Sequence, residues 1–412
     1  MHEATRLTRM GRLGEATAAI RRALIGTPAA QAPQAPVPPQ VPPDAVDSGN
    51  REGSGMREDG THIWDATPVA PGSQQFAVPM PPAAAAANVA ASPPPLMPDP
   101  APPPAAPSAP ELPAADRDEP PSGTEDFSEG VYKHALQTLR YKLYSPPNHA
   151  QHGLPLVVML HGCTQDPDDF AVGTRMNEFA REQGFFVLYP AQAGSANPSR
   201  CWNWFKPIHQ QRDSGEPGMI AGATEAIIGE YDIDKRRVYI AGLSAGGAMA
   251  VIVADAYPEI FSAVGVHSGL PRGAASNVIS ALSVMKRSGS PPPVMARTHP
   301  PAPTIVFHGD EDNTVHPQNG EYVLAAALQQ GTANAAAVQV ERGEPGPGRA
   351  YTRSIYRDSG GAVQAEHWLV HGAGHAWAGG DGEGSHTDAT GPDATRAMLN
   401  FFFERSRAET RN

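Results

Sequence analysis

The sequence has 412 residues and a formal net charge of −12, and a chain of this length would usually hold two or three domains. The acidity is spread along the chain, and no basic stripe follows the N-terminus, which argues against nucleic-acid binding. No apolar run reaches the ~18–20 residues of a membrane span. The only two cysteines, Cys163 and Cys201, are too few for a four-ligand structural zinc site, and we expect neither a metal nor a cofactor.

Residues 1–26 are predicted to form a basic amphipathic helix. Apolar residues recur at three- and four-residue spacing from Leu7 to Leu24, and arginines occupy much of the other surface. The arginines interrupt any apolar core, so no signal peptide is visible. Such a helix either docks on a partner, an anionic membrane surface or a hydrophobic granule, or is simply solvated or self-associating. The sequence leaves both interpretations open.

Residues 27–125 are predicted to be a disordered, Pro/Ala-rich linker. More than half of the 45 prolines lie between Pro28 and Pro121, and large apolar side chains are scarce there. Burial of so few apolar groups would not offset the entropy cost of ordering the chain. The run His62-Ile63-Trp64-Asp65 is a small apolar island in this linker and a candidate weak contact motif.

Residues 126–406 are predicted to be one α/β catalytic domain. The expected strands are one or two within Tyr132–Tyr144, then Leu154–Leu160, Phe185–Pro190, Arg237–Gly242, Phe261–Val266, Thr304–Phe307 and Gln364–Val370. The expected helices are Gly173–Gln183, Gly218–Tyr231, Ala245–Tyr257 and Pro392–Glu404. Apolar strands that alternate with helices predict a mostly parallel central sheet with helices on both faces.

The run Gly242-Leu243-Ser244-Ala245-Gly246 is the first candidate for chemistry. A lone Gly-x-Ser-x-Gly is a weak signal, but here it joins a predicted strand directly to a predicted helix. That context is typical of a nucleophile elbow, in which a tight turn lifts the serine hydroxyl above the edge of the sheet. We therefore predict that Ser244 is the nucleophile; the alternative is a structural serine in an ordinary turn.

A serine nucleophile needs a base, and His375 is the best candidate. It lies in a glycine-rich loop after the last predicted strand, which fits the chain order Ser, acid, His. His371 stands at the strand end and is expected to be structural. His386 lies in a Gly/Asp-rich loop with no strand to position it.

The acid that orients the base is expected in His308-Gly309-Asp310-Glu311-Asp312, directly after the strand Thr304–Phe307. Asp312 is the predicted acid because it projects from further along the loop. Asp310 is the reserve candidate, since its position next to the strand also suits an Asx-type bond that braces the turn.

Backbone N–H groups are predicted to form the oxyanion hole. One is the N–H of Ala245, next after the nucleophile, and the other is that of Cys163 in the loop after Leu154–Leu160. Cys163 and Cys201 each follow a predicted buried strand, so both loops should open on the same sheet edge. A disulfide between them would hold the oxyanion loop rigid; the alternative is two reduced, partly buried thiols.

Aromatic side chains near these loops are predicted to contact the substrate. Trp202 and Trp204 lie in the run Ser199–Phe205, and Trp377 follows His375 by two residues. Exposed aromatics at this edge would form an apolar platform for acyl chains, aryl groups or a polyester strand. The alternative is that some of them pack beneath the loop.

The chain resembles the polyhydroxybutyrate depolymerase family of esterases, which are similar to feruloyl and acetylxylan esterases. The resemblance covers roughly Tyr132 to Phe403 and rests on five motifs in order: Leu160-His161-Gly162-Cys163-Thr164-Gln165, Cys201-Trp202-Asn203-Trp204, Gly242-Leu243-Ser244-Ala245-Gly246-Gly247, His308-Gly309-Asp310 and Gly374-His375-Ala376-Trp377. It implies an α/β-hydrolase fold and hydrolysis of short-chain hydroxyalkanoate, aromatic or acetyl esters, often outside the cell.

The leading hypothesis is a serine esterase that acts through an acyl-enzyme on hydroxyalkanoate oligomers or polymer. A feruloyl- or acetylxylan-type esterase and a serine peptidase on the same fold are the enzymatic alternatives. A granule- or surface-associated binding protein is the non-enzymatic one. No polymer-binding module is visible after the catalytic domain, so soluble oligomers or small esters are the expected substrates. The cysteine pair and the resemblance favour an extracellular protein, whereas the lack of a visible signal peptide favours a cytoplasmic one.

Overall fold

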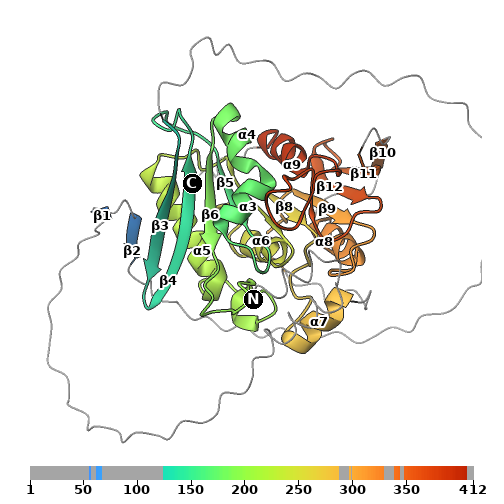
Figure 1. Cartoon of the computed structure of the whole chain (residues 1–412), viewed down its shortest axis with the longest axis horizontal. Coiled ribbons are helices and arrows are strands. Elements are labelled where there is room, and N and C mark those ends of the chain that lie inside the picture. The colour runs from blue at the N-terminus through green and yellow to red at the C-terminus, as the bar shows by residue number, and fades with distance from the viewer. Residues whose placement is uncertain are drawn as a thin grey trace, which may run out of the picture. The chain divides into compact units, whose positions relative to one another are not determined.

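The computed structural model (Figure 1) describes residues 124–286, 297, 299–328, 338–343 and 348–405, and the backbone of two short strands at 55–56 and 62–66. The predicted helix at 1–26 and nearly all of the predicted linker lie outside these residues. None of the helices described is both long enough and apolar enough to cross a membrane.

A twelve-stranded mixed sheet forms the centre of the fold, in the order β1-β2-β3-β4-β6-β5-β7-β8-β9-β12-β11-β10. Its strands are β1 (Gly55–Met56), β2 (His62–Ala66), β3 (Asp126–His134), β4 (Gln137–Ser145), β5 (Leu156–Leu160), β6 (Phe186–Ala191), β7 (Val238–Leu243), β8 (Ala263–His267), β9 (Thr304–Gly309), β10 (Val338–Gly343), β11 (Tyr351–Arg357) and β12 (Val363–Val370). A separate two-stranded parallel sheet joins β13 (Trp377–Ala378) to β14 (Thr387–Asp388).

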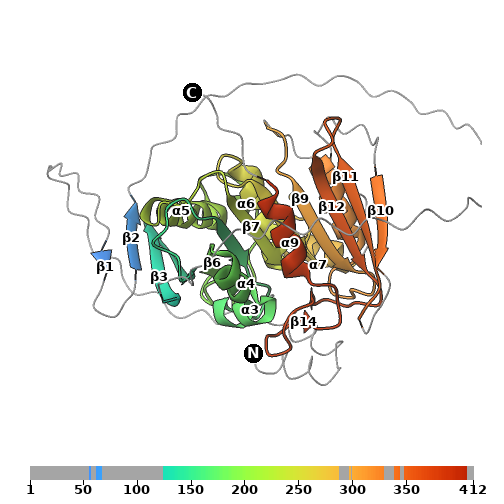
Figure 2. The same cartoon turned by 90° about the horizontal axis from the view of Figure 1, so that it is seen from above.

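The helices described are α3 (Pro167–Thr174), α4 (Met176–Gln183), α5 (Gly215–Glu230), α6 (Ala245–Ala256), α7 (Val278–Lys286), α8 (Gln318–Leu328) and α9 (Ala394–Phe403), with a short 3-10 turn, η1 (Pro207–Gln210). Figure 2 shows α5 and α6 on one face of the sheet and α3, α4 and α9 on the other.

Strand β5 shows why helices cover both faces. Its five residues are all fully buried, and successive side chains of a strand point to opposite faces. Leu156, Val158 and Leu160 therefore belong to one hydrophobic core, which includes α5 and α6. Val157 and Met159 belong to the other, which includes α3, α4 and α9. An apolar strand of this kind is stable only between two helical layers.

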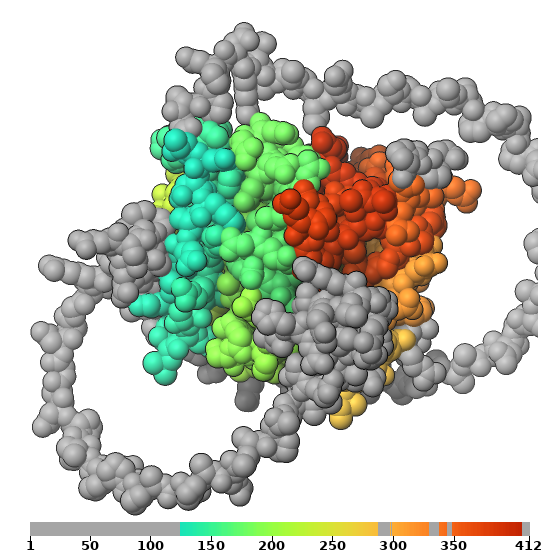
Figure 3. Space-filling view, in the orientation of Figure 1, coloured from blue at the N-terminus to red at the C-terminus, as the bar shows by residue number. Residues whose placement is uncertain are grey.

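The order of the strands confirms the predicted α/β-hydrolase fold. Strands β6, β5, β7, β8, β9 and β12 run parallel, and the chain reverses direction across the sheet at β5, which lies between β6 and β7. Ligands of open α/β sheets bind outside the carboxyl ends of the strands at such a reversal. Figure 3 shows the β3–β4 hairpin, the α3–α4 region and the segment after β12 side by side on one face.

Two differences from the predicted elements have clear local causes. The single helix expected over Gly173–Gln183 is two helices, because Arg175 adopts a left-handed conformation with φ 57° between α3 and α4. Helix α3 begins earlier than expected, where the Asp166 side chain accepts the N–H of Asp169 and Pro167 occupies the first turn. The apolar island at His62–Asp65 lies in strand β2, which pairs in parallel with β3.

Candidate active site

Strand β7 leads into a tight turn that carries Ser244 at its tip, with φ 58° and ψ −118°, and α6 begins at the next residue. Two glycines permit the turn. A Cβ atom on Gly242 would lie 2.4 Å from the backbone carbon of Gly246, and one on Gly246 would lie 2.0 Å from the carbonyl oxygen of Leu160. Any side chain at either position would push these backbones apart. The local structure is therefore that of a nucleophile elbow.

His375 and Asp312 lie in hydrogen-bond contact, with 2.7 Å between His375 Nδ1 and Asp312 Oδ2. The other carboxylate oxygen of Asp312 accepts the backbone N–H groups of Thr314 and Val315, each at 2.9 Å. A carboxylate only accepts, so Nδ1 of His375 carries the hydrogen and donates it. This tautomer leaves Nε2 free to accept a proton, as a general base requires.

A second histidine stands behind Asp312. His308 Nε2 donates to the carbonyl oxygen of Val315 at 2.8 Å and lies 3.4 Å from Asp312 Oδ2, and both side chains are fully buried. Burial alone would raise the pKa of Asp312, but electrostatic attraction to His375 and the hydrogen bonds from His308 and His375 outweigh it and lower that pKa. Asp312 is therefore a carboxylate throughout the neutral range.

Asp310, the reserve acid, has a different set of partners. Its Oδ2 hydrogen-bonds Nδ1 of His371 at 2.8 Å, and its Oδ1 accepts the N–H of Gly372 at 2.7 Å. Asp310 thus braces the turn after β12, and His371 stands at the strand end as a partner of that brace. The geometry favours Asp312 as the acid for His375.

Cys163 and Cys201 form a disulfide, as the sequence predicted, and it ties the loop after β5 to the loop after β6. In the same loop, Gln165 accepts the N–H of Gly162 at 2.9 Å, and the N–H of Thr164 donates to the Ser199 carbonyl at 2.7 Å. The disulfide and these hydrogen bonds thus fix the loop that would supply the Cys163 N–H before any substrate binds.

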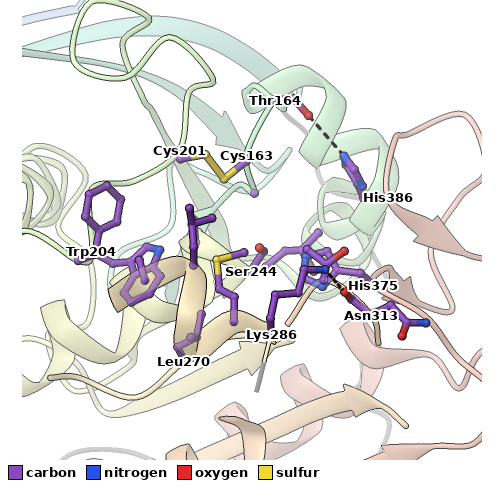
Figure 4. Close-up of a pocket in the computed structure, with 18 of the residues that line it drawn as sticks. Cys163, Thr164, Cys201, Trp204, Ser244, Leu270, Lys286, Asn313, His375 and His386 are labelled. Atoms are coloured by element: carbon purple, nitrogen blue, oxygen red, sulfur yellow. Dashed lines mark hydrogen bonds between the residues drawn. A yellow bond between two sulfur atoms is a disulfide. The ribbon is translucent and has the colours of Figure 1, made fainter. Parts of the chain in front are cut away.

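These groups meet in one cavity of about 410 Å³. Ser244, His375, Cys163 and Ala245 all line it, and Figure 4 shows Ser244 near its centre. Much of the wall is apolar and comes from the loop after β6, the loop after β8 and helix α7: Trp204, Phe205, Leu270, Val278, Leu282 and Met285. A cavity of this size with a few converging polar groups is typical of a small-molecule site.

Of the three tryptophans predicted as substrate contacts, the structure places only Trp204 on this cavity. Trp202 is 0% exposed and packs against His161, while Trp377 is 1% exposed and packs between Phe170 and His267. The prediction is therefore not supported for Trp202 and Trp377, which belong to the core. A sequence pattern cannot tell an aromatic beneath a loop from one on its surface.

Several lining residues were missed from the sequence. Helix α7 was not predicted, although Val278, Ala281, Leu282 and Met285 follow helical spacing and this signal could have revealed it. His386, set aside for want of a strand, lines the cavity beside β14. No group of three or more metal-binding side chains occurs among the residues described.

Removal of the disulfide is expected to destabilise the protein. Cys163 and Cys201 are 38 residues apart, and closing a loop of this length usually contributes about 2–4 kcal/mol to the free energy of unfolding. We expect Cys201→Ser to lower that free energy by this amount in urea unfolding. Thiol titration of the denatured, unreduced wild type should find no free thiol; two titratable thiols would contradict the assignment.

Acid is expected to destabilise the fold between pH 6.5 and about 4. Burial lowers the pKa of His161 to about 4 and that of His267 to about 3, and each ring nitrogen that accepts a backbone N–H requires the neutral form. As the pH falls, the unfolded chain binds these protons before the folded protein does. The free energy of unfolding is therefore highest above pH 6.5, and below pH 6.5 it falls by up to about 1.4 kcal/mol per pH unit for each histidine. Asp312 contributes only below this window, because its pKa is about 3.9 in the unfolded chain and lower still in the folded protein.

Urea unfolding at pH 7.5, 6.5, 5.5 and 4.5 measures the slope of the unfolding free energy against pH. His267→Gln keeps an acceptor for the Ala378 N–H but removes the titrating group, so its slope should be shallower than that of the wild type. An unfolding free energy that stays constant from pH 6.5 to 4.5 would contradict the prediction.

The chain is similar in sequence to known esterases. Residues 139–344, half of the chain, match the family described as "Esterase PHB depolymerase". The chain is 30% identical over 232 residues to poly(3-hydroxyalkanoate) depolymerase C of Paucimonas lemoignei, a match that covers 54% of each protein. It is also 30% identical over 242 residues to feruloyl esterase B of Neurospora crassa, which covers 53% of this chain and 77% of that esterase.

The chain thus spans about half the length of the matched depolymerase and about three quarters of the feruloyl esterase. Among solved structures, an acetyl xylan esterase from Aspergillus awamori matches with a TM-score of 0.47 and 21% identity, over 57% of this chain and 89% of that structure.

Proposed function

This chain belongs to the esterase PHB depolymerase family, and we propose that it is a serine esterase that hydrolyses carboxylic esters through Ser244, His375 and Asp312. The observation that carries the proposal is the elbow serine in the same cavity as a histidine whose Nδ1 is bound to a buried carboxylate. A structural serine in a turn would not require either partner.

The proposed reaction has two steps. Ser244 Oγ attacks the ester carbonyl carbon while its proton passes to His375 Nε2, and the carbonyl oxygen gains the electron pair. The N–H groups of Cys163 and Ala245 are proposed to bind that oxyanion; Ala245 is also the first residue of α6, whose dipole favours negative charge. His375 then protonates the departing alcohol oxygen. Water attacks the acyl-enzyme by the same route and releases the acid and free Ser244.

The proposed substrates are esters with a short acyl group, such as hydroxyalkanoate oligomers. The apolar wall formed by Trp204, Leu270 and helix α7 suits an acyl chain or an aryl ring. The names of the matched relatives support both polyester and aromatic esters as substrates. The Cys163–Cys201 disulfide supports an oxidising compartment, and hence an extracellular protein.

A panel of esters tests the proposal. The full chain is assayed with p-nitrophenyl acetate and butyrate, hydroxybutyrate oligomers, methyl ferulate and acetylated xylan, together with p-nitroanilide amides matched to the first two. We expect turnover of the short p-nitrophenyl esters and much slower turnover of the matched amides. Faster turnover of the amides would favour a peptidase, and no hydrolysis of any ester would refute the proposal.

A further inference from the structure

Two polar residues on the cavity wall take no part in the proposed reaction. Thr164 and His386 both line the cavity, and Thr164 Oγ1 lies 3.4 Å from His386 Nε2 although the residues are 222 positions apart in the chain. That distance is at the long limit of a hydrogen bond, so the contact is weak and both polar groups are available to a ligand. Figure 4 shows the pair beside the cavity.

The backbone at both residues is strained. Thr164 has φ 71° and His386 has φ 55°, in the left-handed region that non-glycine residues rarely adopt, and Ser244 is the third such residue on this cavity. Each costs on the order of 1 kcal/mol or more and persists only where the surroundings enforce it. Such strain clusters at sites where a side chain must point into a binding pocket.

A network of hydrogen bonds enforces this arrangement. Asp169 accepts the N–H of Ser385 at 2.8 Å and the Gln165 amide at 3.0 Å, and Gln165 also donates to the Ser385 carbonyl at 3.0 Å. The residues that directly follow Thr164 and precede His386 are thereby tied together. The His386 backbone carbonyl also accepts the N–H of Trp377 at 2.7 Å. The two side chains are positioned before a ligand binds.

The position of the pair assigns it to one half of the ester. In Figure 4, His375 and His386 lie on the same side of Ser244, and Trp204 lies on the opposite side. His375 must protonate the leaving oxygen, so the alcohol half of the ester extends toward His375 and the acyl half toward Trp204.

We propose that Thr164 and His386 form a subsite that binds a second, uncharged hydroxyl on the alcohol half of the ester. The inference rests on the proposed esterase function. Among the candidate substrates it favours esters of polyhydroxy alcohols over hydroxyalkanoate oligomers, whose alcohol half carries a carboxyl group in place of a second hydroxyl. Burial, followed by the charge of His375, lowers the pKa of His386 to about 4, so the ring is neutral at pH 7. A neutral imidazole and a hydroxyl each donate and accept, which suits a hydroxyl and offers no ionic attraction to a carboxylate.

A pair of matched esters tests the subsite. 2-Hydroxyethyl butyrate and propyl butyrate differ only by a hydroxyl in place of a methyl, and the readout is the ratio of their kcat/KM values with the full chain. We expect the wild type to favour the hydroxyethyl ester. His386→Phe should lower the ratio by about three- to tenfold, the worth of one neutral hydrogen bond. 3-Butyryloxybutanoate carries a carboxylate in place of the hydroxyl, and its kcat/KM should not exceed that of propyl butyrate.

Three further variants make the test decisive. Thr164→Val keeps the shape of the side chain and should lower the ratio as well. If His386→Phe does not fold, this variant alone tests the subsite. His386→Asn tolerates the left-handed backbone and should retain part of the preference. His152→Phe, at an exposed histidine paired with Asp232, is the control and should leave the ratio unchanged.

The outcomes separate the two claims. An equal ratio in the wild type, Thr164→Val and His386→Phe would overturn the subsite while the esterase proposal stands. Failure of the wild type to hydrolyse either ester would overturn the proposed function and the subsite with it.

Discussion

Replacement of Ser244 by alanine is expected to lower kcat for p-nitrophenyl butyrate by at least about 10⁴-fold, with little change in stability. The serine hydroxyl forms the covalent intermediate, and what remains without it is only the contribution of the oxyanion donors and of substrate binding. Ser244 is 7% exposed at the tip of its turn, and alanine loses a single oxygen without altering the fold.

Ser268→Ala is a closely matched control. Ser268 is also buried, also has a left-handed backbone with φ 50°, and also stands directly after a central strand, β8. It does not line the cavity, so its variant should keep most of the activity. A fluorophosphonate should label the wild type and the Ser268 variant but not the Ser244 variant, as detected by mass. Full activity of Ser244→Ala would refute the nucleophile assignment.

Asp312→Asn is expected to lower kcat by about 10³- to 10⁴-fold. The N–H groups of Thr314 and Val315 would hold the amide oxygen where Oδ1 now lies, so the amide NH₂ would face His375. An NH₂ only donates, which forces Nδ1 of His375 to accept and places the proton on Nε2. In that tautomer the histidine has no lone pair for the serine proton.

The variant Asp310→Asn distinguishes the role of Asp310 from that of Asp312. Asp310 bonds His371 and Gly372, so its loss should weaken the turn and lower the unfolding free energy, with kcat changed by less than about tenfold. Measurement of kcat and of urea unfolding on both variants decides the matter. A larger loss of kcat in Asp310→Asn than in Asp312→Asn would assign the acid to Asp310.

The central strands could be predicted because their signals are local, and the three proposed catalytic residues were chosen from their positions after such strands. Strands β5, β7 and β9 are buried on both faces and read as short apolar runs. Ser244 and Asp312 follow such runs directly, so chain order alone brings them to one edge of the sheet.

The substrate-facing residues could not be predicted in the same way. Trp202 and Trp204 are two positions apart in one loop, yet only Trp204 reaches the cavity, and this depends on how residues distant in sequence pack against the loop. His386 owes its position to Asp169 and Gln165, which lie more than 200 residues earlier. No periodicity or composition records such a contact.

The hydrogen bond from the Ser385 N–H to Asp169 joins residues that are 216 positions apart in the chain. A ribosome that has made the chain only as far as Ser244 has already produced the proposed nucleophile, but not Asp312, His375 or Ser385, whose N–H Asp169 accepts in the complete fold. With the proposed triad, the nascent protein at that stage lacks both the base and the acid that ester hydrolysis requires. The proposed activity therefore requires nearly the whole catalytic region to emerge and its long-range contacts, which form slowly, to be made.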